Sequence, residues 1–147
     1  MKEKFFEFLK QYNLYDEEVI NYISTRMIIV DYDREDAKDY IGCFYTLNHD
    51  IVTGFRLCVP KMVDDKTVSI NIHEYVHLLN IYKCLGSEYK EDKFDDLLPV
   101  LYEFIYLNEN DPETLEERRE FIMKSKYTSI KRMIYTCEDN KILKKTK

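Results

Sequence analysis

The most chemically informative pattern in the chain is the pentapeptide His73-Glu74-Tyr75-Val76-His77, an H-E-x-x-H sequence. In a helix, residues four positions apart share a face, so the two imidazoles can bind one metal ion. Imidazole nitrogens are good ligands of Zn²⁺, and the carboxylate between them can accept a proton from water beside the metal. The pattern therefore predicts a zinc site with His73 and His77 as ligands and Glu74 as the general base.

This site requires a helix, and the flanking sequence predicts one. Asp64, Asp65 and Thr67 are suitable N-cap residues, and neither Gly nor Pro interrupts the chain between them and Gly86. Apolar residues recur throughout this stretch, so the helix is expected to be buried. In the alternative interpretation, the two histidines are ordinary core residues held by hydrogen bonds, and the glutamate between them lies on a solvated face.

A catalytic zinc site takes three protein ligands and keeps one position open. No histidine follows His77, which excludes the metzincin arrangement with its third histidine. Residues 97–107 are apolar at every position except Glu103, and an unpaired buried carboxylate costs several kcal/mol. Glu103 is therefore the preferred third ligand, although it would reach solvent if its helix were only half buried. Rival ligands lie in the polar run before this segment: Glu88, Glu91, Asp92, Asp95 and Asp96.

This arrangement resembles the gluzincin metallopeptidases, which pair H-E-x-x-H on one helix with a glutamate ligand on the next. The run from Leu97 to Glu103, with Pro99 inside it, is similar to the oligopeptidase branch related to thimet oligopeptidase. The resemblance covers residues 68–107. It implies a zincin-like fold, a Zn²⁺ cofactor held by His73, His77 and Glu103, and hydrolysis of peptide substrates.

The chain departs from these oligopeptidases in two ways. It has no glycine soon after the second histidine, and no segment aligns with their downstream Tyr/His residues, which polarise the substrate carbonyl. Any equivalent donor must come from elsewhere in the chain. The candidates are His49, Tyr127 and Tyr135.

Two other functions are compatible with the same residues. A deformylase-like amide hydrolase would use Cys43, upstream of the metal helix, as its third ligand, but the glycine-rich motif of such enzymes is missing. A non-catalytic zinc-binding interaction or regulatory module is compatible with the small size of the chain. Metal analysis of ligand variants and a peptide-cleavage assay distinguish these alternatives.

Length and composition predict a single domain over residues 1–147. A chain of this length buries about two-thirds of its unfolded surface, enough for a core without disulfides. The four cysteines are scattered, and no signal peptide or bilayer-length apolar run is evident, so we expect a cytoplasmic protein with no membrane partner. The net charge of −6 argues against a nucleic-acid partner. The sequence does not specify an oligomeric state.

The expected fold class is α+β, mainly helical and zincin-like, with a small antiparallel sheet ahead of the metal helix. Two N-terminal helices are predicted at about residues 2–12 and 15–26. Residues 27–33 either extend the second helix or begin a strand. After the helix that carries Glu103, a long charged helix is predicted at about 112–137.

A β-hairpin is predicted upstream of the metal helix. Residues 40–47 and 53–62 are rich in β-branched and aromatic side chains and flank the turn candidate Asn48-His49-Asp50. In gluzincins, the strand before the metal helix lines the cleft and can pair with an extended peptide. Residues 55–59 are expected to form that strand, as either a substrate-binding edge or a plain core strand.

Overall fold

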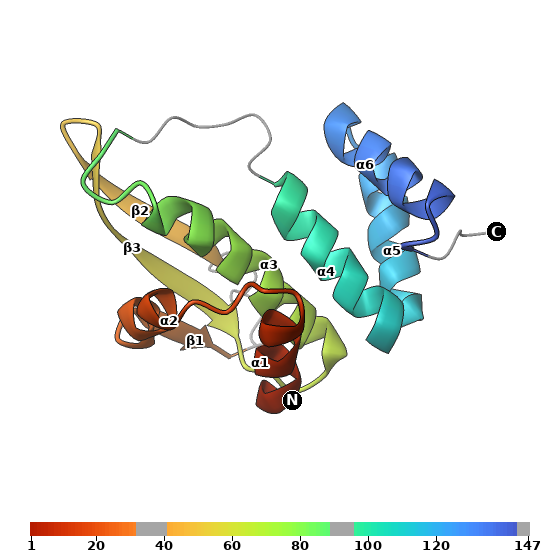
Figure 1. Ribbon diagram of the computed structural model, residues 1–147, viewed down its shortest axis with the longest axis horizontal. Coiled ribbons are helices and arrows are strands. Elements are labelled where there is room, and N and C mark those ends of the chain that lie inside the picture. The colour runs from red at the N-terminus through yellow and green to blue at the C-terminus, as the bar shows by residue number, and fades with distance from the viewer. Residues whose placement is uncertain (32–40, 89–95, 144–147) are drawn as a thin grey trace.

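The computed structural model describes residues 1–31, 41–88 and 96–143. Within these ranges the fold is α+β, with six helices and a three-stranded mixed sheet. Helix α3 packs against both the sheet and helix α4, and α5 and α6 lie on the far side of α4 (Figure 1). In chain order, the elements are α1 (Lys2–Gln11), α2 (Glu17–Ser24), β1 (Met27–Val30), β2 (Gly42–Asn48), β3 (Ile51–Pro60), α3 (Asp65–Tyr82), α4 (Leu97–Asn110), α5 (Pro112–Met123) and α6 (Thr128–Asp139).

The sheet has the strand order β1-β3-β2. Strands β2 and β3 are antiparallel, whereas β1 runs parallel to β3, with Met27 opposite Leu57. The prediction of a purely antiparallel sheet is therefore wrong for β1. The β-branched residues of β1 favour an extended strand, but such a propensity does not determine the direction in which that strand pairs. Of the segment 27–33, whose structure the sequence left open, residues 27–30 form a strand, and 32–33 lie outside the described residues.

The predicted hairpin is confirmed. Its two-residue turn is formed by His49 and Asp50, which both have positive φ angles, 52° and 66°. Such angles are typical of the tight turns that match the twist of paired strands, and Asn, Asp and His tolerate them better than most residues. Residue 40, the first of the predicted strand, lies outside the described residues.

Strand β3 lies in the centre of the sheet, whereas a strand that pairs with a peptide substrate must have a free edge. Leu57 pairs with Cys43 on one side and with Met27 on the other, so this part of the strand has no free edge. Of the two expected alternatives, the plain core strand therefore holds for Leu57 and Cys58, whereas Phe55 and Arg56 pair with β2 alone among the described strands. Within the described sheet, the outer strands are β1 and β2.

Helix α3 forms where the sequence predicts it, and a capping box defines its start. The Asp64 carboxylate accepts a hydrogen bond from the Thr67 backbone N–H at 2.8 Å, and the Thr67 hydroxyl accepts one from the Asp64 N–H at 3.0 Å. Farther along, the fully buried Tyr75 donates its hydroxyl hydrogen to the Leu14 carbonyl at 3.0 Å and accepts from the Asp16 N–H at 3.2 Å. These hydrogen bonds fix helix α3 to the segment between α1 and α2.

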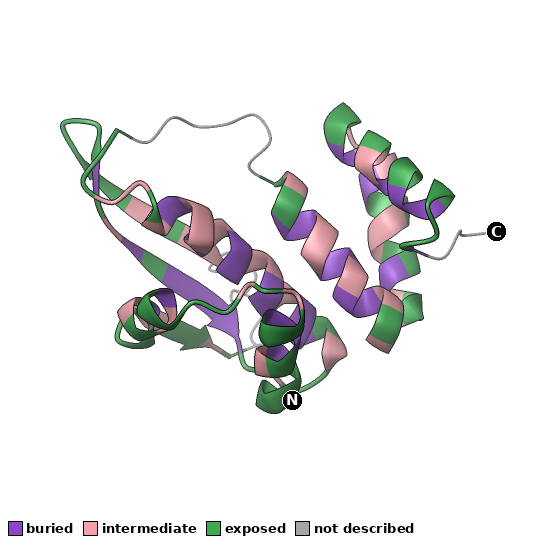
Figure 2. Cartoon of the chain, in the orientation of Figure 1, coloured by how far each residue is buried: buried purple, intermediate pink, exposed green. Residues whose placement is uncertain are grey.

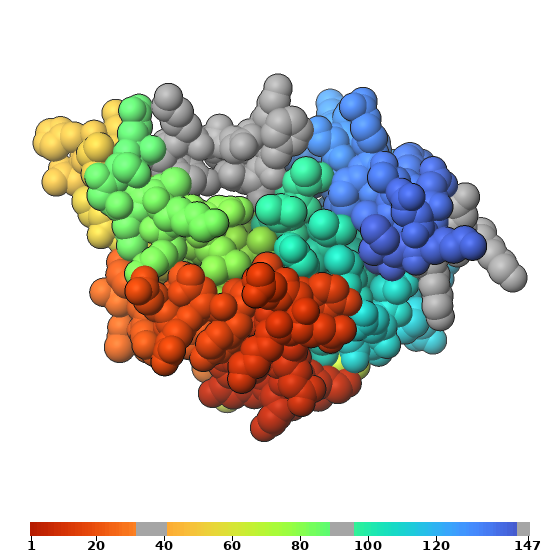
Figure 3. Space-filling model, viewed as in Figure 1, coloured from red at the N-terminus to blue at the C-terminus, as the bar shows by residue number. Residues whose placement is uncertain are grey.

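The buried apolar side chains form one connected cluster that extends from the sheet through α3 and α4 to α6. Figure 2 shows this burial along β3 and on α3 and α4. Helix α1 contributes Phe8, whose ring meets that of Tyr106 edge-on at 5.5 Å. In Figure 3, α1 and α2 cover part of α3 on the face shown. None of the helices in the described part of the chain has the length and apolar character needed to cross a bilayer.

The predicted long helix at 112–137 is wrong, because the chain turns between α5 and α6. Ser125 donates its hydroxyl hydrogen to the Ile122 carbonyl, a local bond that competes with helix continuation. The two helices are then joined by a bidentate ion pair between Arg119 and the buried Glu138, at 2.9 and 3.0 Å. This turn folds α6 back against α5 and α4.

Candidate metal centre

The two histidines of the H-E-x-x-H pentapeptide lie one turn apart on α3, with ring centroids 5.0 Å apart. Helix α4 runs beside α3 in the opposite direction, because His73 meets Glu103 whereas His77 meets Asp96. Asp96 and Glu103 are seven residues apart and so share one face of α4, about 10.5 Å apart along its axis. Each histidine therefore has a carboxylate within 3 Å, and Asp96 also lies within ion-pair distance of His73.

Three side chains converge as a possible metal site: His73, His77 and Asp96 offer ligand atoms that all lie within 4.8 Å of one another. Asp96 Oδ1 lies 2.9 Å from His77 Nε2 and 3.8 Å from His73 Nε2. Ligands about 2.0 to 2.1 Å from a tetrahedral zinc ion are about 3.3 Å apart. The donor types therefore allow this group to hold a metal ion, and the spacing is comparable to that of a tetrahedral zinc site.

Asp96 is available for this role because it does not cap its own helix. It occupies the N-cap position of α4, yet its side chain makes no capping hydrogen bond. Its carboxylate is directed to the histidines instead, and 51% of the side chain is exposed. A metal at this position is open to solvent on one side, as a catalytic site requires.

Glu103 lies on the other side of His73, and its carboxylate is almost completely buried, with 4% of the side chain exposed. Its Oε1 is 2.7 Å from His73 Nδ1. Arg118 on α5 donates from Nε to Oε2 at 2.7 Å and from Nη2 to Oε1 at 3.3 Å. Both carboxylate oxygens therefore have partners, and Glu103 lies outside the group of converging ligand atoms.

The electrostatic environment of these groups follows from burial and from their pairing. Burial acts to lower the pKa of His73, but its interactions with the carboxylates of Asp96 and Glu103 outweigh this effect and raise the pKa to about 9. The proximity of the two histidines holds the pKa of Asp96 well below its ordinary value. Burial acts to raise the pKa of Glu103, but its interactions with His73 and Arg118 lower it below the ordinary value. The ion-free site therefore contains charged carboxylates beside a protonated imidazole.

Glu74 is the next residue along α3 and lies close to both histidines. Burial raises the pKa of its carboxyl group, against the lowering effect of His73 and His77. A carboxylate with a raised pKa is a better proton acceptor near neutral pH than an ordinary glutamate. Glu74 therefore lines the cavity beside His73 as a buried carboxyl group whose pKa is raised.

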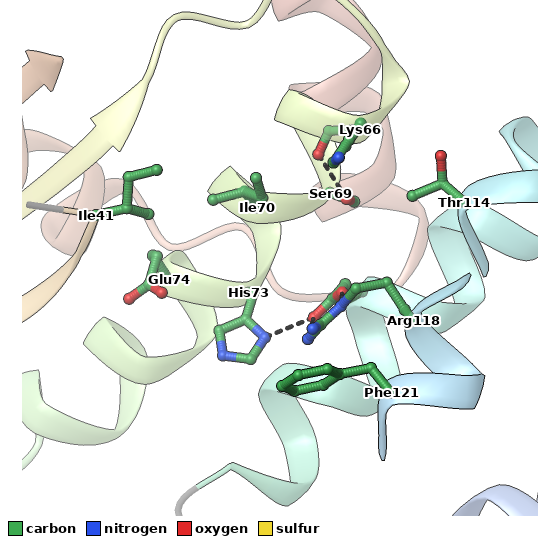
Figure 4. Close-up of a pocket in the computed structure, with 10 residues that line it drawn as sticks. Ile41, Lys66, Ser69, Ile70, His73, Glu74, Thr114, Arg118 and Phe121 are labelled. Carbon is green, nitrogen blue, oxygen red and sulfur yellow. Dashed lines mark hydrogen bonds and ion pairs between the residues drawn. The ribbon is translucent and has the colours of Figure 1, made fainter. Parts of the chain in front are cut away.

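A cavity of about 720 Å³ opens beside His73 and Glu74. It lies between α3 and α5, and Figure 4 shows Lys66 and Ser69 on α3 facing Thr114 and Arg118 on α5. The cavity is large enough to hold the side chain of a ligand beside His73 and Glu74, whereas His77 and Asp96 are not among its lining residues.

The other predicted candidates lie elsewhere. Cys43, on β2, is outside the group of converging ligand atoms, and burial together with the nearby Glu74 raises the pKa of its thiol to about 12. Glu88 forms a β-bridge with Ile51, and Glu91, Asp92 and Asp95 fall outside the described residues. None of the carbonyl-polarising candidates is among the residues lining the cavity beside His73: His49, Tyr127 and Tyr135.

The structure thus assigns greater importance to two residues than the sequence did. Asp96 was one of five acidic residues in a polar run, and the signal that separates it from the others is its position directly before the apolar helix α4. Arg118 carried no signal, because only the turn at Asp111 and the packing of α5 on α4 bring it to Glu103.

Comparison with protein-family models, with curated proteins and with solved structures gives no match to this chain. The assignment of a function therefore depends on the geometry of the site.

Proposed function

We propose that the chain is a zinc-dependent metallopeptidase of zincin-like architecture that hydrolyses peptide bonds. The observation that supports this most strongly is the convergence of His73, His77 and Asp96 to within 4.8 Å, next to a cavity that His73 and Glu74 line. This combination supplies a three-ligand site, a base and room for a substrate.

The proposed ligands are His73 Nε2, His77 Nε2 and the Asp96 carboxylate. Glu103, which the sequence favoured as third ligand, is better suited to orient His73. A histidine that binds metal through Nε2 commonly donates its Nδ1 hydrogen to a carboxylate, which fixes its tautomer and ring position. The 2.7 Å distance between His73 Nδ1 and Glu103 fits this arrangement, and ligation by Glu103 would require it to leave its bonds with His73 and Arg118.

In the proposed reaction, zinc supplies the Lewis acidity that polarises the scissile carbonyl and makes water acidic near neutral pH. Glu74 accepts the proton that the attacking water loses, and later delivers it to the nitrogen of the departing amine. Glu103 keeps the hydrogen of His73 on Nδ1, so that Nε2 presents its lone pair. Arg118 neutralises the buried Glu103 and holds it in place.

The test is a comparison of the zinc-loaded protein with its Glu74→Gln variant on a pool of short unstructured peptides. The amide is nearly isosteric but cannot accept the proton, so we expect zinc to remain bound while turnover falls by about 100-fold or more. Glu116→Gln, an exposed position on α5, is the matched control and is expected to retain activity.

Each result of this comparison has a definite meaning. Equal cleavage by the wild type and Glu74→Gln would identify a contaminating protease. If the zinc-loaded wild type cleaves no peptide, the proposal is wrong and the non-catalytic zinc module becomes the better explanation. Release of zinc by Cys43→Ser, with zinc retained by Asp96→Asn, would favour the deformylase-like alternative.

A further inference from the structure

The cavity between α3 and α5 carries two cationic side chains, Lys66 and Arg118. Its acidic lining residues are Glu74 and Glu103, both next to His73 at one end. Glu103 is neutralised by Arg118 and His73. The two cations balance the two carboxylates in formal charge, but the charges are separated, because Lys66 lies on α3 away from His73 and the carboxylates beside it.

The positions of Lys66 and His73 on one helix set the distance between the cation and the reacting bond. They are seven residues apart, so they share a face of α3 and lie about 10.5 Å apart along its axis. Ser69 and Ile70 lie between them on the same wall (Figure 4). A group reaching from a carbonyl near His73 toward Lys66 would therefore follow this wall.

Arg118 is fixed in place and can still bind another group. It uses two of its five N–H hydrogens on Glu103, and the other three have no hydrogen-bond acceptor among the described residues. Its side chain is 35% exposed. A guanidinium that is already oriented loses little entropy when it binds a second carboxylate.

Lys66 is also available. It is exposed, and no described residue forms an ion pair with it. Its ammonium group lies on a flexible stem, so it can follow a ligand of variable length. Together, the two cations offer charge-assisted hydrogen bonds to a planar anionic group in a partly enclosed space.

We propose that this cavity binds a carboxylate of the peptide substrate, either an acidic side chain next to the scissile bond or a nearby free C-terminus. The proposal rests on the proposed peptidase function, since it places the scissile carbonyl beside His73. An extended chain advances about 3.3 to 3.6 Å per residue, so a carboxylate one or two residues past the scissile bond lies about 7 to 10 Å from the carbonyl. That reach matches the separation of His73 and Lys66 along α3.

The experiment measures the binding of hydroxamates to the zinc-loaded protein by calorimetry, because a hydroxamate occupies the metal whether or not the protein hydrolyses peptides. Three compounds are compared. The first carries a glutamate-like side chain next to the hydroxamate and an amidated terminus; the second is its neutral glutamine-like counterpart. The third has the glutamine-like side chain and a free terminal carboxylate. The first and third distinguish the two sources of the carboxylate.

At least one of the carboxylate compounds is expected to bind about fivefold tighter than the neutral one. In Lys66→Met, the ratio of the dissociation constants of the neutral and carboxylate compounds should fall to nearly one. In Lys83→Met, at the opposite end of α3, it should be unchanged, which controls for the loss of one positive charge.

Equal affinity for all three compounds would overturn the proposed carboxylate pocket, and so would a failure of all three to bind. A preference for the carboxylate compounds that persists in Lys66→Met would overturn it as well. Failure of the peptidase gives a different pattern. If the carboxylate compounds bind preferentially but the wild type cleaves no peptide, the pocket stands and the proposed hydrolysis is wrong.

Discussion

Replacing Asp96 with Asn and Glu103 with Gln should separate zinc ligation from structural support. Each substitution removes one carboxylate charge at almost constant volume. The proposed site assigns Asp96 to the metal and Glu103 to His73 and Arg118, so the two variants should fail in different ways. The assays are zinc affinity by competition with a chromogenic chelator, and urea unfolding of the ion-free proteins.

The expected losses of zinc affinity can be derived from typical binding energies. A four-ligand structural zinc site contributes about 10 to 16 kcal/mol, or about 2.5 to 4 kcal/mol per ligand, so Asp96→Asn should weaken binding by about 70- to 900-fold. Loss of a carboxylate that orients a ligand histidine typically costs about 10- to 100-fold, which we expect for Glu103→Gln.

The free energy of unfolding without zinc should show the opposite order, with the larger loss in Glu103→Gln and the smaller loss in Asp96→Asn. Glu103 is buried, with 4% of its side chain exposed, and its loss leaves Arg118 without its carboxylate, so Glu103→Gln should cost about 3 to 5 kcal/mol. Asp96 is half exposed, and its substitution should cost about 1 kcal/mol or less. Asp50→Asn at the hairpin tip and the exposed Glu116→Gln are the matched controls and should change neither quantity. Loss of zinc in Glu103→Gln, with binding retained in Asp96→Asn, would refute the assignment and make Glu103 the third ligand.

Three further predictions concern protonation and the scaffold. Because the pKa of His73 is raised to about 9, zinc uptake at pH 7 should release about one proton from it, measured by calorimetry in buffers of different ionisation enthalpy; no release would contradict this. In the ion-free protein, the same raised pKa stabilises the fold fully below about pH 6.5 and loses this effect as the pH rises through about 9, so urea midpoints should fall over that range rather than rise. Glu138→Gln should lower the unfolding free energy by about 3 to 5 kcal/mol, because it leaves Arg119 without its buried partner, and a loss under 1 kcal/mol would refute this.

The parts of the fold that follow from local patterns were predictable from the sequence. The capping residues Asp64 and Thr67 and the unbroken run after them define α3, and the turn at His49 and Asp50 defines the hairpin. The positions of His73, Glu74 and His77 relative to one another follow from helical periodicity alone.

The surroundings of the site depend on contacts between distant residues, and these were not predictable. The sequence showed that Glu103 is buried and needs a partner, but its partners in the structure are His73 and Arg118, and Arg118 reaches it only because the chain turns at Asp111 and packs α5 on α4. Asp96 could not be separated from its acidic neighbours until the start of α4 was fixed opposite His77. The parallel pairing of β1 likewise depends on tertiary packing rather than on its own residues.

The most direct test of the metal centre is an anomalous-scattering map at the zinc absorption edge, from crystals grown with one equivalent of zinc. The proposed site predicts a single strong peak within about 2.0 to 2.2 Å of His73 Nε2, His77 Nε2 and an Asp96 carboxylate oxygen, with Glu103 still bonded to His73 Nδ1. A peak bound by Glu103 in place of Asp96, or one remote from both histidines, would contradict it.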